Sequence, residues 1–175
     1  RGGRLALDGG DWAEFPKIAT DWQAVSFSLW LKLGQVPGQW TALITNNGLG
    51  DVFFQFDRDV MQFHLPSVNA VVSQTSMAEL VGKWVHITVT HEPGRKVLYI
   101  DGFKDNEAAV APVPSFVIGP GRIGSWSQDP GRDLVAQIDD LQIYNRALTQ
   151  EEVAYLAGRT APFQQPFPAP QEEEE

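Results

Sequence analysis

The sequence predicts an all-β protein, a sandwich or barrel of antiparallel strands, with one short helix near the C-terminus. Short segments in which apolar and polar residues alternate recur along the chain, and clusters of turn-forming residues separate them. Many short strands at this spacing are typical of β-sandwiches and β-barrels. No internal repeat is visible in the sequence.

The first strong strand is expected at 24–33, because four apolar side chains alternate there with Ser28, Trp30 and Lys32. The apolar set consists of Phe27, Leu29, Leu31 and Leu33. Further strands are expected at 40–46, 51–57, 60–65 and 70–75. Turn signals separate these strands at Gln35–Gly38, Asn47-Gly48, Asp57–Asp59 and Pro66–Asn69.

The segment 82–102, GKWVHITVTHEPGRKVLYIDG, predicts two consecutive hairpins. In its first strand, one face carries Val85, Ile87 and Val89, and the other carries Trp84, His86, Thr88 and Thr90. The turn Glu92–Arg95 has Pro at its second position and Gly at its third. A return strand is expected from about Lys96 to Ile100. Asp101-Gly102 then suits a two-residue turn with positive φ, after which Phe103 begins another strand.

The last strands are expected at 116–126, a glycine-punctuated segment, and at 134–145. The helix follows in TQEEVAYLAG, where Thr149 as N-cap and Glu152 three residues later form a capping box. Val153 and Leu156 give it an apolar stripe, and Gly158 stands where a C-terminal cap belongs. The Pro- and Glu-rich residues 159–175 are expected to form a linker or tail, which leaves 1–158 as the domain.

The amino-acid composition argues against some classes of binding partner. The formal net charge is −9; residues 159–175 hold one Arg and four Glu, so residues 1–158 carry −6. A chain this acidic repels phosphate backbones, which argues against a nucleic acid partner. The chain has no cysteine and no apolar run of transmembrane length, so disulfides and membrane insertion are not expected. It begins with neither Met nor a signal segment, so a fragment of a longer protein is expected.

Four segments in order resemble laminin-G-like domains of the concanavalin A-like superfamily, of the bacterial type without disulfides. They are SFSLWLKL, GKWVHITVTHEPGRKVLYIDG, GRIGSW and QIDDLQIYNRALTQEEVAYLAG, preceded by the similar opening LALDGGDWAEF. The resemblance covers about residues 4–158. It implies a jelly-roll sandwich of two antiparallel sheets, in a binding or adhesion module attached to other domains of an exported protein. An extracellular, cell-envelope or periplasmic location is expected on the same ground.

An enzymatic function is not expected. Sugar-cleaving enzymes need two carboxylates that flank one bond, which on a strand requires acidic residues at even spacing. No predicted strand carries such a pair, and the Glu-x-Asp-x-x-Glu type of signature in the superfamily's hydrolases is absent. The three histidines are dispersed, and His86 is interpreted as a structural residue.

A calcium ion is a possible structural cofactor. The resemblance implies a Ca²⁺ site where the N-terminal Asp-Gly loop meets the final strand, with Asp8, Asp11 and Asp139 as hard oxygen ligands. Asp139 falls on the face of Leu141 and Ile143 by simple alternation, and a buried carboxylate needs a cation or a hydrogen-bond donor. The alternative is that Asp8 and Asp11 only form turns, and that Asp139 pairs with Arg146 or backbone amides.

The leading hypothesis for function is recognition of a carbohydrate or another cell-surface ligand through loops at the rim. Sugar rings stack on exposed aromatic side chains, and polar groups beside them fix the orientation. Trp126, with Asp129 and Arg132 close in sequence, is the first candidate contact; Trp40 and Trp12 follow. The alternatives are a structural or protein-interaction domain without a small ligand and, third, a glycan-cleaving enzyme.

Overall fold

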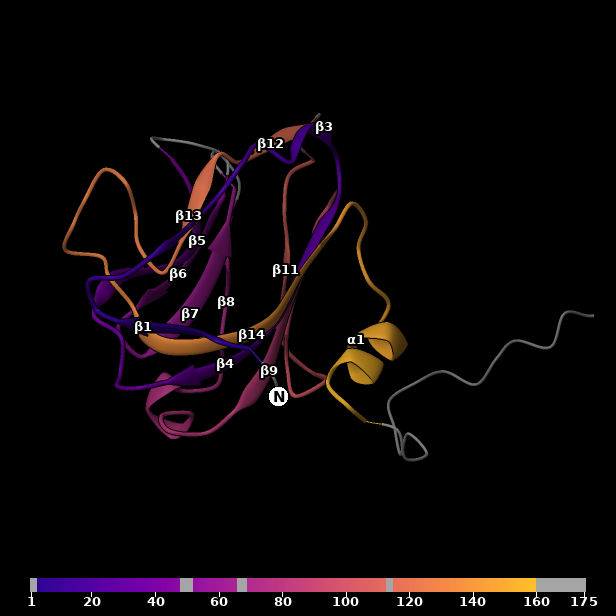
Figure 1. The fold of residues 1–175 in the computed structure, drawn as a ribbon. Coiled ribbons are helices and arrows are strands. Elements are labelled where there is room, and N and C mark those ends of the chain that lie inside the picture. Colours follow the sequence, from indigo (N-terminus) through magenta and orange to yellow (C-terminus); the bar gives the residue numbers. More distant parts are fainter. Residues whose placement is uncertain (1–2, 48–51, 66–68, 113–114, 160–175) are drawn as a thin grey trace, which may run out of the picture.

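The computed structural model describes residues 3–47, 52–65, 69–112 and 115–159. Two six-stranded antiparallel sheets pack face to face as a sandwich, and one short helix lies outside it (Figure 1). A separate two-stranded sheet pairs β3 with β12. The predicted all-β, jelly-roll sandwich with one short C-terminal helix is therefore confirmed. No helix among the described residues is long and apolar enough to cross a membrane.

The first sheet, called sheet A, has the strand order β1-β14-β4-β9-β10-β11. Its strands are β1 Leu5–Asp8, β14 Val135–Tyr144, β4 Val25–Leu33, β9 Val85–Glu92, β10 Arg95–Ile100 and β11 Phe103–Ala109. The second sheet, called sheet B, has the order β2-β13-β5-β6-β7-β8. Its strands are β2 Ala13–Phe15, β13 Gly121–Ile123, β5 Gln39–Asn46, β6 Phe53–Asp57, β7 Val60–His64 and β8 Val71–Val72.

The small sheet consists of β3 Ala19–Trp22 and β12 Phe116–Ile118. A 3₁₀ turn covers Met77–Glu79, and the helix α1 covers Gln150–Leu156. Most predicted strands agree with these bounds. The segment 116–126 is an exception, because the chain turns at Gly119-Pro120 and forms two strands in different sheets. The predicted strand 70–75 shrinks to β8. The turns at Asn47-Gly48 and Pro66–Asn69 lie largely outside the described residues.

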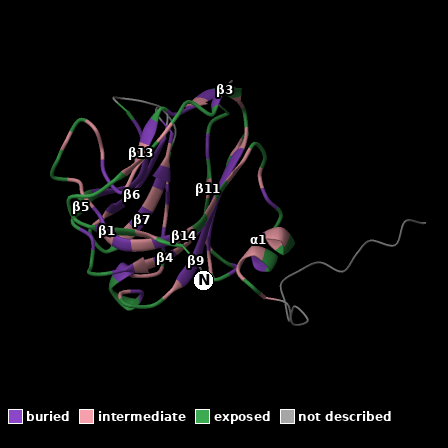
Figure 2. Ribbon diagram, viewed as in Figure 1, coloured by how far each residue is buried: buried purple, intermediate pink, exposed green. Residues whose placement is uncertain are grey.

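The core fills the space between the two sheets with apolar side chains. As predicted, the apolar face of 24–33 lies there, together with three phenylalanines from sheet B. Phe27 packs against Phe54 and Phe63, with ring centroids 6.4 and 5.8 Å apart. All three rings are completely buried. The alternation that predicted β4 therefore corresponds to one face that points into the sandwich. Figure 2 shows that buried residues gather on the strands of the two sheets.

The outer face of sheet A is covered as well, which the alternation did not predict. A second apolar cluster forms there from Val97, Tyr99, Leu148 and Val153, with Tyr144 and Leu156 against it. Helix α1 and the segment before it supply half of these residues (Figure 1). The Ser26 hydroxyl donates to the Arg146 carbonyl and accepts from the Leu148 amide, which fixes that segment on the sheet. Polar residues of β9 such as Thr88 are therefore also buried.

The turn between β10 and β11 has the conformation predicted for Asp101-Gly102. Both residues have positive φ, 50° and 82°. A Cβ at Gly102 would lie 3.1 Å from the Cα of Ala154 and 3.2 Å from the Cβ of Ala157. Glycine at this position therefore provides both the turn conformation and the close approach of helix α1.

Helix α1 begins and ends at the predicted caps. The Glu152 amide donates to the Thr149 hydroxyl at 3.3 Å, and the Thr149 amide donates to the Glu152 carboxylate at 2.9 Å. Glu152 also binds the Arg146 guanidinium through both oxygens, and this hydrogen bonding lowers the pKa of Glu152 to about 2. Gly158 has φ 77°, the left-handed conformation of a C-terminal cap.

Replacing Thr149 by Ala should therefore lower the free energy of unfolding by about 1 kcal/mol, because the first turn of α1 loses its side-chain acceptor. Urea denaturation followed by tryptophan fluorescence measures this change. Thr20 is an exposed strand threonine, so Thr20→Ala is the matched control and should change stability far less. Equal losses in the two variants would contradict a specific capping role.

Candidate functional site

The loop between β13 and β14, residues 124–134, stands on the side of the sandwich (Figure 1, the orange loop at the left). It leaves and returns beside β5, because Gly124 N donates to Leu43 O and Ala42 N donates to Arg132 O, both at 2.9 Å. Its middle residues form an isolated antiparallel bridge between Trp126 and Asp129. The loop is thus fixed at both ends and braced across its middle.

The structure brings together the three loop residues that the sequence grouped as ligand contacts. The Cζ atom of Arg132 lies 4.3 Å from the centre of the Trp126 ring. The Nε atom of Arg132 donates to Asp129 Oδ2 at 3.0 Å, and Gly131 N donates to Asp129 Oδ1 at 3.0 Å. The hydrogen bond from the Gly131 backbone amide, and then that from the Arg132 side chain, lower the pKa of Asp129. A half-buried indole is therefore held between a cation and the strands below.

Below Trp126 lies a floor of side chains from β6 and β7. Phe53 meets the Trp126 ring edge to face, with centroids 5.7 Å apart, and stacks on His64 at 4.9 Å. The His64 ring nitrogen Nε2 lies 3.4 Å from Nε2 of Gln55. Burial, and then the charge of Lys96, lower the pKa of His64. Gln55 is 3% exposed, and its buried Oε1 has no hydrogen-bond partner among the described residues.

The floor residues were not among the ligand contacts predicted from the sequence. Paired residues of adjacent strands point to the same side of a sheet, and Phe53 pairs with His64 while Gln55 pairs with Gln62. A signal existed in the dipeptide Phe53-Phe54, because successive residues of a strand face opposite sides and only one of them can face the core. The other phenylalanine was therefore available for an outer site.

Trp12 belongs to a second cluster on the same sheet. The Cζ atom of Arg122 lies 4.4 Å from the centre of the Trp12 ring. Trp12 Nε1 donates to Glu14 Oε1 at 3.3 Å, and Arg122 Nε lies 3.4 Å from the same oxygen. The Trp12 side chain remains 46% exposed. Sequence reasoning named Trp12 but not Glu14 or Arg122, because Arg122 is more than a hundred residues away along the chain.

Trp40 lies at the start of β5, with φ 59° and 38% exposure. It stands two residues before Ala42, which bonds to the returning end of the 124–134 loop. Trp40 therefore borders the loop, and its role as a ligand contact stays a prediction.

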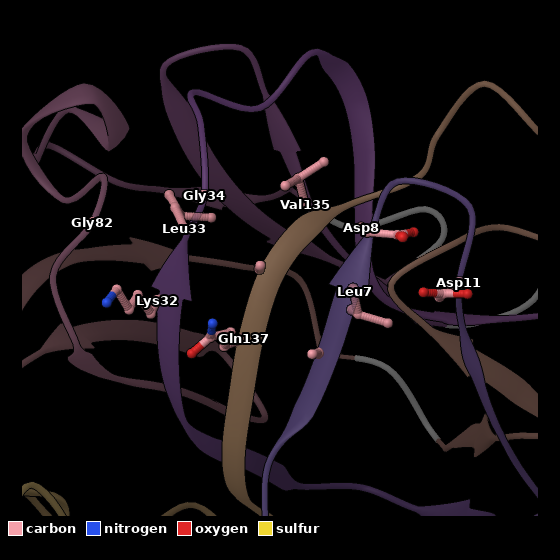
Figure 3. Close-up of a pocket in the computed structure, with 11 residues that line it drawn as sticks. Leu7, Asp8, Asp11, Lys32, Leu33, Gly34, Gly82, Val135 and Gln137 are labelled. Atoms are coloured by element: carbon pink, nitrogen blue, oxygen red, sulfur yellow. The ribbon is translucent and has the colours of Figure 1, made fainter.

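The predicted calcium ligands are only partly brought together. Asp8 and Asp11 line one hollow of about 540 Å³ at the end of β1 and β14, with Lys32 on the other side of β14 (Figure 3). Asp8 pairs with Val135 and Leu5 pairs with Ile138, so Asp139 lies four residues further along the ladder, about 13 Å away. Among the described residues, no three acidic or histidine side chains gather as a metal site.

Calcium takes six to eight oxygen ligands, so Asp8 and Asp11 need backbone carbonyls and water to complete a site. The donor set that this structure offers is small for a resident ion. Calcium binding at this loop stays a prediction, and Asp139 is not part of the same hollow.

The environment expected for Asp139 is wrong. A β-bulge between Asp139 and Gln142, with Asp140 at φ 50°, interrupts the alternation of β14. Leu141 and Ile143 consequently pack against the core, whereas Asp139 pairs with Trp30 on the opposite face. Asp139 is half-buried, and its Oδ1 accepts the Asp140 amide at 2.9 Å, so no cation is needed to compensate a buried charge.

Two arrangements that resemble catalytic groups have structural roles. The Ser28 hydroxyl lies 3.0 Å from Nε2 of His86, but the two residues are 1% and 2% exposed beneath the C-terminal segment. A substrate therefore has no access to this hydroxyl. His86 agrees with the interpretation as a structural histidine.

The expectation that no strand carries acidic residues at even spacing is wrong, because β11 contains Asp105 and Glu107. Both carboxylates are already engaged. Asp105 accepts hydrogen bonds from the amides of Gln74 and Thr75, at 2.7 and 3.1 Å. Glu107 binds Arg95 at 2.7 Å and Lys104 at 3.3 Å. Neither is arranged as the acid–base pair of a glycosidase.

The two packed six-stranded antiparallel sheets define the chain as a β-sandwich protein. The chain belongs to the Laminin_G_3 family of the concanavalin A-like lectin/glucanases superfamily, whose model matches residues 7–154. The resemblance noted in the sequence is thereby confirmed. Comparison with curated protein sequences gives no match.

Solved structures share the fold at low sequence identity. Domain 4 of AbnA, an extracellular GH43 arabinanase from Geobacillus stearothermophilus solved with arabinotriose, has a TM-score of 0.64 and 19% identity, over 87% of this chain and 75% of that chain. The ligand-binding domain of botulinum neurotoxin serotype D, solved with N-acetylneuraminic acid, has a TM-score of 0.69 and 14% identity, over 90% and 42%.

The binding domain of botulinum neurotoxin DC, solved with rat synaptotagmin II, has a TM-score of 0.63 and 14% identity, over 78% of this chain and 36% of that chain. This chain thus spans less than half of either toxin structure. At these identities the similarity shows the fold alone. The fold is one that other proteins use in binding domains.

Proposed function

We propose that this domain is a non-catalytic carbohydrate-binding module, and that Trp126 is its principal contact. The observation that carries the proposal is the Trp126 ring, which Arg132 holds on one side and Phe53 supports from below. An indole fixed in this way loses little conformational freedom on binding, and an indole ring suits the C–H face of a sugar. Asp129 and Arg132 supply polar groups nearby.

The fold supports the same proposal. The arabinanase domain was solved with arabinotriose, and a toxin domain of the same architecture was solved with N-acetylneuraminic acid. The arabinanase is extracellular, so we place this domain outside the cell as part of a larger exported protein. The buried Ser28–His86 pair and the engaged carboxylates of β11 support a role without catalysis.

Replacing Trp126 by Ala should abolish binding on a glycan array or weaken it by at least about tenfold, because an anchoring aromatic residue is typically a hot spot. Isothermal titration calorimetry with the array hit gives the affinity. Tyr155, which is 71% exposed on the far side of sheet A, provides the control Tyr155→Ala. Unchanged binding by Trp126→Ala, in a variant whose melting temperature is unaltered, would contradict the proposal.

A second candidate function is binding of a protein. The toxin domain solved with synaptotagmin shows that another protein of this fold binds a protein ligand. Absence of any glycan signal, together with a specific protein partner whose binding depends on the 124–134 loop, would favour this alternative.

A further inference from the structure

Two tryptophans from separate parts of the chain are held in the same way on this domain. Each indole carries a guanidinium 4.3 or 4.4 Å from its ring centre, and each guanidinium lies beside a carboxylate. The two sets are Trp12, Glu14 and Arg122, and Trp126, Asp129 and Arg132.

Strand pairing places both sets on the outer face of sheet B. Glu14 of β2 pairs with Arg122 of β13, and Arg122 pairs with Thr45 of β5. Thr45 in turn pairs with Phe53 of β6, against which the Trp126 ring packs. Residues paired across antiparallel strands point to the same side, so this row of side chains connects the two tryptophans across one surface.

The residues that support the two tryptophans lie on strands two positions apart in sheet B. Arg122, on which Trp12 stacks, is in β13, and Phe53 below Trp126 is in β6, with only β5 between them. Two strand spacings amount to about 10 Å. A single pyranose or furanose ring is too small to lie over both of these supports, whereas a linear chain that runs across the strands can.

The charges on this surface indicate an uncharged ligand. Both guanidinium groups are compensated by carboxylates, Arg122 by Glu14 and Arg132 by Asp129. Each cation therefore serves to orient its indole and is not left to bind an anionic group. The 46% exposure of Trp12 leaves much of that ring accessible.

We infer that the domain binds an internal stretch of a linear, uncharged polysaccharide across sheet B, with Trp12 and Trp126 as two separate contact points. This inference rests on the proposed carbohydrate-binding function and adds the class of ligand and a second subsite. Trp126 anchors one sugar unit, and Trp12 contacts another unit further along the same chain.

The test is calorimetry of the whole chain with linear arabino-, xylo-, cello- and manno-oligosaccharides of one to six units. The affinity for the matching series should rise by about tenfold or more once the chain is long enough to reach both indoles. Trp12→Ala should remove that rise while leaving binding of the shortest ligand unchanged, and Trp12→Tyr should restore part of it. Trp126→Ala should weaken binding at every length.

The outcomes separate the inference from the function on which it rests. Affinity independent of chain length, or an unchanged six-unit affinity in Trp12→Ala, would overturn the inference while carbohydrate binding remained. Binding restricted to sialylated or otherwise charged glycans on the array would do the same. If wild-type protein bound no glycan at all, the proposed function would fail, and the inference with it. A thermal melting curve for each variant shows that it is folded at the temperature at which its affinity is measured.

Discussion

Replacing Gly121 by Ala is expected to destabilise the domain by about 3 kcal/mol, at the upper end of what overpacking usually costs. Gly121 lies in β13, where an added Cβ would overlap the carbonyl oxygen of Thr45 and lie 2.8 Å from Cε1 of Phe15. The Thr45 carbonyl belongs to the backbone of β5, so the overlap is relieved only if β13 moves away from its neighbour. Urea denaturation monitored by tryptophan fluorescence gives the free energy of unfolding.

Gly10→Ala is the matched control. Gly10 lies in the loop after β1, and no atom lies within 4 Å of the position that its Cβ would take. The control should change stability by no more than about 0.5 kcal/mol. If both variants have the same midpoint urea concentration of unfolding as the wild type, β13 cannot pack against β5 as closely as described. The result also bears on the binding surface, because Arg122 follows Gly121 directly.

The fold was predictable wherever one face of a strand is buried and the sequence alternates. Strand β4 is the clearest case, since its alternate residues from Phe27 to Leu33 all enter the core. The capping box of α1 was equally clear, because it depends on residues three positions apart. By contrast β1, β2 and β3 have only three or four residues each, too few for a period to be recognised.

Alternation failed where the backbone departs from a regular strand. The bulge at Asp139–Gln142 exchanges the two faces of β14. Asp139 therefore does not share the core-facing side of Leu141 and Ile143, as simple alternation had predicted. The turn at Gly119-Pro120 divides 116–126 between two sheets. Proline offers no backbone N–H for a ladder, and this was the signal that the segment contained a break.

The candidate site was predictable only where its members are neighbours in sequence. Trp126, Asp129 and Arg132 occupy one loop, and the structure joins them by direct contacts. The contact of Trp12 with Arg122 depends on the pairing of β2 with β13, which no local pattern reveals. Tertiary pairing therefore determines half of the proposed binding surface.

Acidification should destabilise this protein through His91, by up to about 3 kcal/mol between pH 6.5 and pH 4. His91 is completely buried on β9, and in the part of the chain that the structure describes neither ring nitrogen has a hydrogen-bond partner. Burial, together with the charge of Lys96 on the paired strand β10, lowers the pKa of His91 from 6.5 to about 4. The Phe116 ring, 5.6 Å away, offers no charge to stabilise the imidazolium form.

The direction of this change in stability follows from proton binding. Between pH 6.5 and 4 the unfolded chain binds a proton at His91 and the folded protein does not, so the unfolded state gains stability as pH falls. His64, whose pKa is also lowered, acts in the same direction. The carboxylates with lowered pKa values, such as Glu152 and Asp129, add their own losses at lower pH. The contribution of His91 therefore has to be read from the difference between two pH profiles.

His91→Leu supplies that difference, because leucine keeps an apolar side chain at this position and has no proton to bind. Between pH 7.5 and pH 4.5, the free energy of unfolding should fall less in His91→Leu than in the wild type. Parallel profiles would mean that His91 titrates normally in the folded protein.

A second measurement separates burial from charge, because Lys96 is itself completely buried, with its ammonium donating to the Asn69 carbonyl at 2.8 Å. Burial lowers the pKa of Lys96 to about 8, so at pH 7 this group is still a cation beside His91. In Lys96→Met the neighbouring charge is gone, and the pKa of His91, followed by NMR, should rise toward 6.5. Only desolvation would then keep it low. An unchanged value would assign the whole shift to burial of His91 in the sandwich interior.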